Sequence, residues 1–256
     1  MYAAATYSRP RHRHLPQRRP INHNLEQQAQ ALYKSWFVDF EPFKDGSFVN
    51  SELGPIPEGW SIKHAADICT INIGKTPPRQ EHQWFSNAID AHNWVSISDM
   101  ANCGVYISNT SERLTNEAVQ KFNISLVPKD TILLSFKLTI GRVAISNCEL
   151  TTNEAIARFL TCPSLKYYLY LLLKNYDYNK LGSTSSIATA VNSKIIKSML
   201  VLTPTDTVLN SFANCVDSFF ENIRNRQIEN SSLMSIRDSL LPKLMSGALN
   251  INEIVR

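Results

Sequence analysis

The sequence lacks the short motifs that mark the commonest enzyme active sites. It has no GxSxG serine elbow, no HExxH zinc motif, no GxGxxG dinucleotide loop and no Asn/Asp-Pro-Pro-Tyr/Phe/Trp signature of amino-methyltransferases. Gly74–Thr76 (GKT) resembles the end of a phosphate-binding P-loop, but that loop needs a glycine at the position of Cys69. No motif therefore supports catalysis or nucleotide binding, and we expect that the chain is not an enzyme.

Long apolar runs and paired cysteines are also missing. The longest apolar stretch, Tyr167–Leu173, is far shorter than the roughly 20 residues that a membrane span needs, and the N-terminus lacks the apolar core of a secretory signal. The five cysteines are scattered without a CxxC pair, and the six histidines show no metal-ligand spacing. These absences predict a cytoplasmic protein that binds neither a membrane, nor a metal, nor a cofactor of its own.

Charge is distributed unevenly along the chain, although the net charge is only +4. Residues 21–120 carry 6 basic and 12 acidic side chains, whereas residues 121–200 carry 10 basic and 4 acidic ones. A basic segment attracts polyanions such as DNA, but the same side chains could equally be scattered over a solvated surface. Charge alone leaves both interpretations open.

The start of the chain predicts a disordered basic leader over residues 1–21. Its first 20 residues contain five arginines, three prolines and no acid. Such a segment can resemble an organelle transit peptide or a loose DNA-binding arm, but we favour an unrelated leader.

A short helix is predicted over about residues 25–37, within a helical segment at residues 22–43. Asn24 is a favourable N-cap, and Gln27 stands at the reciprocal position of a capping box. Glu41-Pro42 then ends regular structure. The apolar face of this helix is formed by Leu25, Ala29, Leu32 and Trp36.

Residues 57–203 predict a mixed α/β domain, preceded by a linker at residues 44–56 that is rich in glycine and proline. A helix is expected at Leu165–Asn175, and Val201-Leu202 is typical of a closing strand. The other β-rich runs, which alternate with turn residues, are Asp67–Ile73, Trp94–Ile97, Thr131–Phe136 and Arg142–Ile145.

The segment Asp206–Leu241 predicts one long helix, because it contains neither proline nor glycine. About 35 helical residues would extend for roughly 50 Å, too far for a domain of this size to cover. The helix could lie on its own domain, but its length favours a coiled-coil-like arm paired with another long helix, within residues 204–256. Two rows spaced by seven form the heptad seam: Phe212, Phe219, Arg226, Leu233 and Leu240, and Val216, Ile223, Asn230 and Arg237.

Three loops combine glycine or hydroxyl residues with cations. They are Gly74–Arg79, Ser135–Arg142 and Gly182–Ser186. Hydroxyl groups, cations and backbone N–H groups suit contacts to phosphates and base edges. Each loop alone is typical of an ordinary surface turn, but three in one domain favour DNA binding.

Several segments, in this order, resemble landmarks of type I restriction–modification specificity subunits. Leu25–Phe43 resembles the central conserved region of that family, and Ser51–Trp60 resembles the entry to its second target-recognition domain. Arg226–Leu249 resembles its distal conserved region. The resemblance covers about residues 22–250. The segments are Leu25–Phe43, Ser51–Trp60, Gly74–Arg79, Asn93–Met100, Leu133–Ile145, Gly182–Pro204 and Arg226–Leu249.

The resemblance implies a non-catalytic reader of double-stranded DNA. In this family two recognition domains, held apart by two long antiparallel helices, each read half of a split site. Methyltransferase subunits that use S-adenosylmethionine dock on the specificity subunit and modify adenine N6, and a motor-nuclease subunit can join them for cleavage. The partner methyltransferase, not this chain, is therefore expected to bind S-adenosylmethionine.

On this resemblance, the exposed loops supply candidate DNA contacts. Glycines 74 and 141 are interpreted as turn formers, and Arg224, Arg226 and Arg237 as either DNA-backbone contacts or solvated or paired helix positions. The predicted DNA-binding residues are Lys75, Thr76, Arg79, Ser135, Lys137, Thr139, Arg142, Ser183 and Thr184. The predicted subunit-interface residues are Leu32, Trp36, Phe37, Phe212, Phe219, Ile223, Leu233 and Leu240.

The chain departs from the family in having room for one recognition domain. Three hypotheses follow: a half-subunit that self-associates or pairs with another specificity half, a cassette exchanged by recombination, or a silent, decayed copy. A cytoplasmic coiled-coil adaptor and an enzyme with an unrecognised site are the rival classes.

Overall fold

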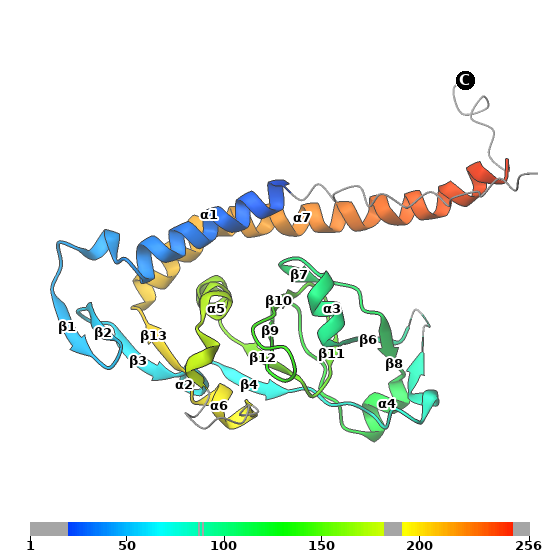
Figure 1. Cartoon of the computed structure of the whole chain (residues 1–256), viewed down its shortest axis with the longest axis horizontal. Coiled ribbons are helices and arrows are strands. Elements are labelled where there is room, and N and C mark those ends of the chain that lie inside the picture. Colours follow the sequence, from blue (N-terminus) through cyan, green and yellow to red (C-terminus); the bar gives the residue numbers. More distant parts are fainter. Residues whose placement is uncertain (1–19, 87, 89, 182–190, 248–256) are drawn as a thin grey trace, which may run out of the picture.

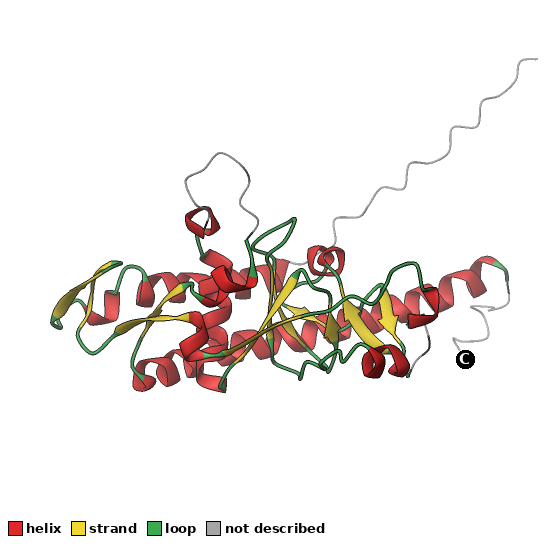
Figure 2. Cartoon of the chain, turned by 90° about the horizontal axis from the view of Figure 1, so that it is seen from below, coloured by secondary structure: helices red, strands yellow, loops and turns green. Residues whose placement is uncertain are grey.

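The chain forms a pair of helices with an α/β domain on one side of it (Figure 1). The computed structural model describes residues 20–86, 88, 90–181 and 191–247. Viewed from the domain side, the strands lie in front of the long C-terminal helix (Figure 2). The predicted fold class, a mixed α/β domain with a long helical arm, is confirmed.

Helices α1 (Pro20–Phe37) and α7 (Asp206–Met245) are held together by aromatic side chains. The ring of Phe37 lies 4.8 Å from that of Phe212 and 4.7 Å from that of Tyr168, both edge to face. The predicted start of α1 was wrong, because Asn24 lies inside the helix and accepts a hydrogen bond from Gln28 instead of capping the N-terminus.

Helix α7 divides into a buried half and an exposed half. The helix has 40 residues and continues past Leu241, its predicted end, with Pro242 inside its last turns. Leu209, Phe212, Val216, Phe220 and Ile223 pack inside the protein. From Ile228 onward, its large apolar side chains are exposed: Ile228, Leu233, Met234, Ile236, Leu240, Leu241, Leu244 and Met245.

The segment predicted as a linker contains regular structure. A 3-10 turn, η1 (Glu41–Phe43), leads into an antiparallel hairpin of β1 (Phe48–Ser51) and β2 (Gly54–Pro57). Gly54 has a φ of +99°, a conformation that residues with a side chain rarely adopt, so this glycine of the predicted linker forms the tight turn of the hairpin.

The domain opens and closes on one antiparallel pair, β3 (Ser61–His64) with β13 (Leu200–Thr203). The predicted closing strand is therefore present. Because entry and exit strands are paired, the chain leaves the domain beside its entry point, next to α1 and α7 (Figure 1). Short helices α2 (Ala65–Ile68) and α6 (Ser193–Lys197) adjoin this pair.

The central sheet has the order β4-β12-β9-β10-β7. All neighbours are antiparallel except β10 and β7. Its strands are β4 (Thr70–Ile73), β12 (Ile156–Leu160), β9 (Ile132–Ser135), β10 (Val143–Ser146) and β7 (Tyr106–Ile107). The predicted runs Thr131–Phe136 and Arg142–Ile145 are β9 and β10, whereas the first part of Asp67–Ile73 belongs to α2.

Helix α5 (Pro163–Asn175) joins this sheet to α7. Its residues from Tyr167 to Leu173 are all buried, which accounts for the apolar run in the sequence. Tyr167 stacks on Phe220 of α7 with 4.2 Å between ring centroids and 9° between planes. The helix is therefore a middle layer between sheet and arm.

A second sheet, in the order β11-β6-β8-β5, forms the far end of the domain. The predicted run Trp94–Ile97 is strand only in part, because Ser96 caps the next helix, α3 (Ile97–Asn102), through the Asp99 amide. Helix α4 (Asn116–Lys121) is capped likewise by Thr115. The strands are β11 (Thr151–Thr152), β6 (His92–Val95), β8 (Glu112–Leu114) and β5 (Phe85–Ser86), and the remaining 3-10 turns are η2 (His82–Trp84) and η3 (Tyr178–Leu181).

Candidate nucleic-acid interface

Two of the three predicted loops meet at one edge of the central sheet. Strands β4 and β9 are both antiparallel to β12, so both end at the edge where β12 begins. This edge gathers the segments Gly74–Arg79, Phe136–Arg142 and Asn153–Ala155, which we call the sheet-edge loops. Backbone bonds tie them together, since Lys75 N donates to Thr152 O and Phe136 N to Ala155 O.

Gly74 sits where a side chain cannot fit. A Cβ there would lie 2.1 Å from Asn153 O and 2.2 Å from Thr152 O, both backbone atoms. The glycine therefore lets β4 turn against the start of β12. This geometry agrees with its interpretation as a turn former, and the same holds for Gly141, whose φ is +89°.

The predicted cations on the first loop already have intramolecular partners. Lys75 Nζ donates to the carbonyls of Phe122 and Asn123, just after α4, at 3.2 and 2.8 Å. Cations are favourable at a helix C-terminus because the last carbonyls lack helical partners. Thr76 Oγ1 donates to a carboxylate oxygen of Glu154.

Arg79 is exposed, and its guanidinium lies over two aromatic rings. Its guanidinium forms a salt bridge with Glu112 at 2.8 Å, and its Cζ lies 4.5 Å from the Trp94 ring and 4.9 Å from the Phe85 ring. Cation–π contact with two rings restrains the guanidinium, so its N–H donors are held in place for an acceptor. Glu112 would have to release it for a bidentate contact.

The second loop is closed by the buried hydroxyl of Ser135. This hydroxyl donates to Thr139 O at 2.6 Å and accepts from Arg142 N at 3.1 Å. Arg142 Nη1 donates to Ile97 O at 2.7 Å, at the start of α3. Ser135 is fully buried and Arg142 half-buried, so in this conformation both shape the loop, whereas Lys137 and Thr139 are exposed on its outer side.

The third predicted loop, with Ser183 and Thr184, lies outside the described residues. The segment just before it adjoins the second loop, because a Cβ at Gly141 would lie 3.1 Å from the Tyr178 ring. Tyr178 Oη donates to Leu173 O at the end of α5.

The predicted interface residues fall into two groups. Phe37, Phe212 and Ile223 are buried within the chain, and Leu32, Trp36 and Phe219 are half-buried against the same core, so they pack α1, α7 and the domain together. Leu233 and Leu240 lie on the exposed half of α7, at 55% and 40% exposure.

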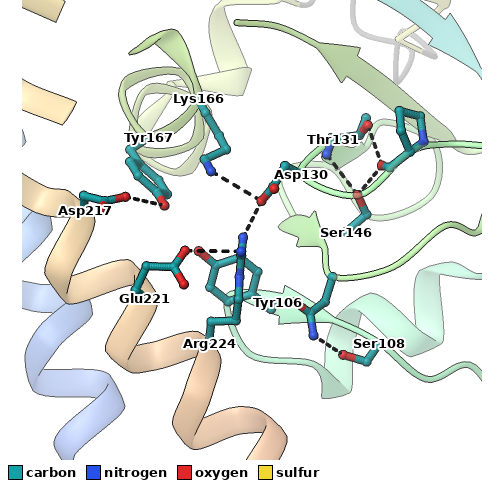
Figure 3. Close-up of polar contacts among 12 residues, drawn as sticks. Tyr106, Ser108, Asp130, Thr131, Ser146, Lys166, Tyr167, Asp217, Glu221 and Arg224 are labelled. Carbon is teal, nitrogen blue, oxygen red and sulfur yellow. Dashed lines mark hydrogen bonds and ion pairs between the residues drawn. The ribbon is translucent and has the colours of Figure 1, made fainter. Parts of the chain in front are cut away.

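An ionic cluster around the buried Arg224, which the sequence did not reveal, fixes α7 to the domain (Figure 3). Arg224 of α7 forms salt bridges with Asp130, in the turn before β9, and with Glu221 at 3.2 Å. Lys166 of α5 contacts the same Asp130 oxygen at 3.3 Å. The Arg224 guanidinium also lies 4.4 Å from the Tyr106 ring of β7. We call these residues, with Gln227, the α7 joint.

Gln227 extends the joint to the main chain of the sheet. Its amide donates to Tyr106 O and accepts from Tyr106 N, both at 3.0 Å, as a neighbouring strand would. A Cβ at Gly104 would come within 2.7 Å of this amide, so the glycine makes room for it. The half-buried amide thus caps the edge strand β7.

The charges in the joint shift pKa values. Burial alone would raise the pKa of the Asp130 carboxyl, but Lys166 and Arg224 together hold it below its usual 3.8. Burial raises the pKa of Tyr106 to about 12, so its phenol stays neutral at physiological pH. Near neutral pH, the joint therefore pairs an ionised Asp130 carboxylate with the cations of Lys166 and Arg224. Arg224, one of the three arginines that the sequence offers as DNA-backbone contacts or helix positions, is paired and largely buried.

No group of three metal-ligating side chains occurs within residues 20–86, 88, 90–181 and 191–247. Among the helices described, none is long and apolar enough to cross a membrane.

The protein family described as "Type I restriction modification DNA specificity domain" matches residues 57–230 of this chain. The chain is 31% identical over 248 residues to the type I restriction enzyme MjaIX specificity subunit of Methanocaldococcus jannaschii, which covers 91% of this chain and 55% of that protein. It is 26% identical over 291 residues to the HindI specificity subunit of Haemophilus influenzae, with coverages of 90% and 62%.

Solved structures show the same fold. The HsdS subunit from Thermoanaerobacter tengcongensis matches with a TM-score of 0.51 and 13% identity, over 90% of this chain and 53% of that one. The type I restriction-modification S subunit from M. genitalium matches with a TM-score of 0.52 and 15% identity, over 88% and 54%. The chain thus spans little more than half the length of these relatives.

The family match includes the whole α/β domain and the α7 joint, and it covers well over half of the chain. The chain belongs to the type I restriction–modification DNA specificity domain family, a family of non-catalytic DNA recognition domains.

Proposed function

We propose that this chain is a DNA-binding half of a specificity subunit that reads one half of a split site in the cytoplasm. The observation that carries the proposal is the convergence of the sheet-edge loops on one edge of the central sheet. Lys137, Thr139 and Arg79 present exposed cations and a hydroxyl there. Such groups make the phosphate and base-edge contacts of DNA readers.

The same edge also carries carboxylates that must be displaced or accommodated. Glu112 holds Arg79, and Glu154 accepts from Thr76. Exchanging a carboxylate for a guanine edge keeps the arginine paired, so only a base that offers two acceptors compensates for the lost salt bridge. The internal pairs therefore act as a filter against non-specific binding.

The partners proposed for this chain are methyltransferase subunits carrying S-adenosylmethionine and a motor-nuclease subunit. In support, a solved structure with the same fold is described as showing complex assembly of the type I restriction–modification system. This chain would bring its DNA half-site to the methyltransferase, which would modify adenine.

The exposed half of α7 supports a second long helix as a further partner. Leu233, Leu240 and Leu244 are spaced by seven and four, with Arg237 between them. An apolar seam with a polar residue selects register and partner in paired helices. We propose that a second copy or another specificity half covers it, which would supply the second half-site.

The test is selection of duplexes with a randomised core by the purified chain at controlled salt concentration. Enrichment of one short motif is expected. In the variant Lys137→Ala/Thr139→Ala the affinity for that motif should fall by about 1–3 kcal/mol. The matched control is Lys129→Ala, which removes the same charge at the opposite end of β9 and should leave the motif preference unchanged. No enrichment, or equal losses in both variants, would contradict the proposal.

A further inference from the structure

The tip of the second sheet-edge loop holds an apolar side chain almost entirely in solvent. Leu138 is 98% exposed, the highest value among the exposed large apolar side chains described. A leucine in this position makes next to no contact with its own chain. It therefore contributes nothing to the hydrophobic core, and exposing it to water is unfavourable.

The backbone at Leu138 is also strained. Thr139 N donates to Lys137 O at 2.6 Å, which closes a three-residue turn about Leu138, whose φ is +61°. A positive φ is disfavoured for leucine and natural for glycine. Neither burial nor backbone preference explains a leucine here, and unexplained strain of this kind gathers at functional positions.

Other non-glycine residues with positive φ in the described part of the chain have an internal explanation. Asp130 pairs with Lys166 and Arg224, and Asn123 is of a type that tolerates this region. Phe40 packs edge to face on Phe48 and Trp60. Leu138 differs from them because its side chain points away from the molecule.

The loop holds this leucine on a rigid base. Ser135 O accepts from Gly141 N at 3.1 Å, Ser135 N donates to Arg142 O at 2.9 Å, and the Ser135 hydroxyl secures Thr139 O. A three-residue turn is also narrow, so Leu138 lies at its tip, with the exposed Lys137 and Thr139 on either side. The tip has the shape of a wedge with polar groups on both sides.

We infer that Leu138 is a wedge that inserts between two base pairs of the DNA half-site, with Lys137 and Thr139 contacting the backbone on either side. The inference rests on the proposed function and deepens it. Apolar side chains inserted in this way partly unstack a base step and kink the duplex. Leu138 would favour sequences with an easily unstacked step, such as pyrimidine–purine, at that point of the site.

The geometry favours insertion over a protein-binding role. A lone leucine flanked by a lysine and a threonine is too small an apolar surface for a protein partner, whereas burial between bases covers it on two faces. Contact with a thymine methyl group in the major groove is the competing DNA contact, and the test separates the two.

The experiment uses the full chain and the duplex enriched by the selection described above, with 2-aminopurine placed at each position of the recognised motif in turn. Insertion predicts a fluorescence increase at one step on binding. Leu138→Gly suits the positive φ and removes the wedge, so it should abolish the increase and weaken binding roughly ten-fold. Leu138→Met should keep both. Leu53→Gly, at another exposed leucine in the β1–β2 turn, should change neither.

The outcomes are distinguishable. If no duplex is enriched, the proposed function fails and the wedge with it. If wild-type protein binds its duplex without a fluorescence increase at any position, or Leu138→Gly retains the increase, the wedge is refuted while DNA reading stands. Binding that weakens when uracil replaces thymine, with no unstacking, would assign Leu138 to methyl contact instead.

Discussion

Replacing Arg224 with methionine should loosen α7 from the recognition domain. Methionine keeps much of the length and apolar stem of arginine and removes its charge. The change deletes the salt bridges to Asp130 and Glu221 and the contact with the Tyr106 ring at 4.4 Å. Lys166 remains beside Asp130, so that carboxylate keeps one partner.

The magnitude follows from burial. Arg224 is 9% exposed, whereas Asp130 is 37% exposed and so stays partly hydrated when its partner is removed. Removing one member of a fully buried pair costs about 3–5 kcal/mol, but the exposure and the remaining lysine reduce the expected loss to about 2 kcal/mol. Combining Arg224→Met with Asp130→Asn should reveal a coupling free energy of about 1–2 kcal/mol.

The assay is urea unfolding of the full chain, which gives the free energy of unfolding for each variant. Lys34→Met is the matched control, because Lys34 of α1 is 65% exposed and its ion pair with Asp39 lies outside the joint. Its loss should stay below about 0.5 kcal/mol. Equal effects at Arg224 and Lys34, or a coupling below about 0.3 kcal/mol, would refute the assignment of Arg224 as the anchor of the joint.

Four further results are expected. The stabilisation contributed by Asp130 is present above its usual pKa of 3.8 and is lost as pH falls through its lower pKa in the folded protein, so the stability gap between wild type and Asp130→Asn should close in acid and persist at neutral pH. Gly74→Ala should lower the free energy of unfolding by more than about 2 kcal/mol in urea titrations, because its Cβ would meet Asn153 O; wild-type stability would refute the close approach. Arg142→Ala should reduce the affinity for the selected duplex by about 1–3 kcal/mol in a salt-controlled gel shift, and unchanged affinity would remove it from the interface. In native mass spectrometry, Leu233→Asp/Leu240→Asp should convert species that contain two copies of this chain, or this chain and another specificity half, to species with one copy. A wild-type chain that is present as one copy in its complex with the methyltransferase would exclude pairing through this half of α7.

Local, strongly patterned segments could be predicted from the sequence. The apolar stretch of α5, the strands β9 and β10, and the uninterrupted run of α7 each carry their own periodicity, so they need no distant partner to be recognised. The predicted start of α1 was wrong, because Asn24 suits an N-cap but also fits inside a helix, where its side-chain oxygen accepts a hydrogen bond from Gln28.

Features that depend on distant pairing could not be predicted. The hairpin β1–β2 was interpreted as a linker because its glycines and prolines indicate a turn, a loop or both. The convergence of Gly74–Arg79 with Phe136–Arg142 depends on β12 lying between β4 and β9, which no local pattern shows. The α7 joint was missed for the same reason, since Arg224 and Asp130 are 94 positions apart.

The candidate site was predicted by residue type and refined by the structure. Cations and hydroxyls identified the loops, but sequence could not show that Lys75 caps α4 or that Ser135 is fully buried. Nor did it single out Leu138, because an apolar residue between a lysine and a threonine indicates no role until its exposure and φ are known. The one available signal was a bulky aliphatic residue in a loop otherwise suited to glycine.

We propose that the sheet-edge loops of this chain choose the DNA sequence that is modified. The most direct measurement is a base-resolved map of adenine methylation in cells carrying the partner methyltransferase gene, with and without this chain. We expect a methylated motif that is present only with the chain. One half of that motif should change when residues 136–142 are exchanged for those of a relative. An identical map in the presence and absence of the chain would contradict it.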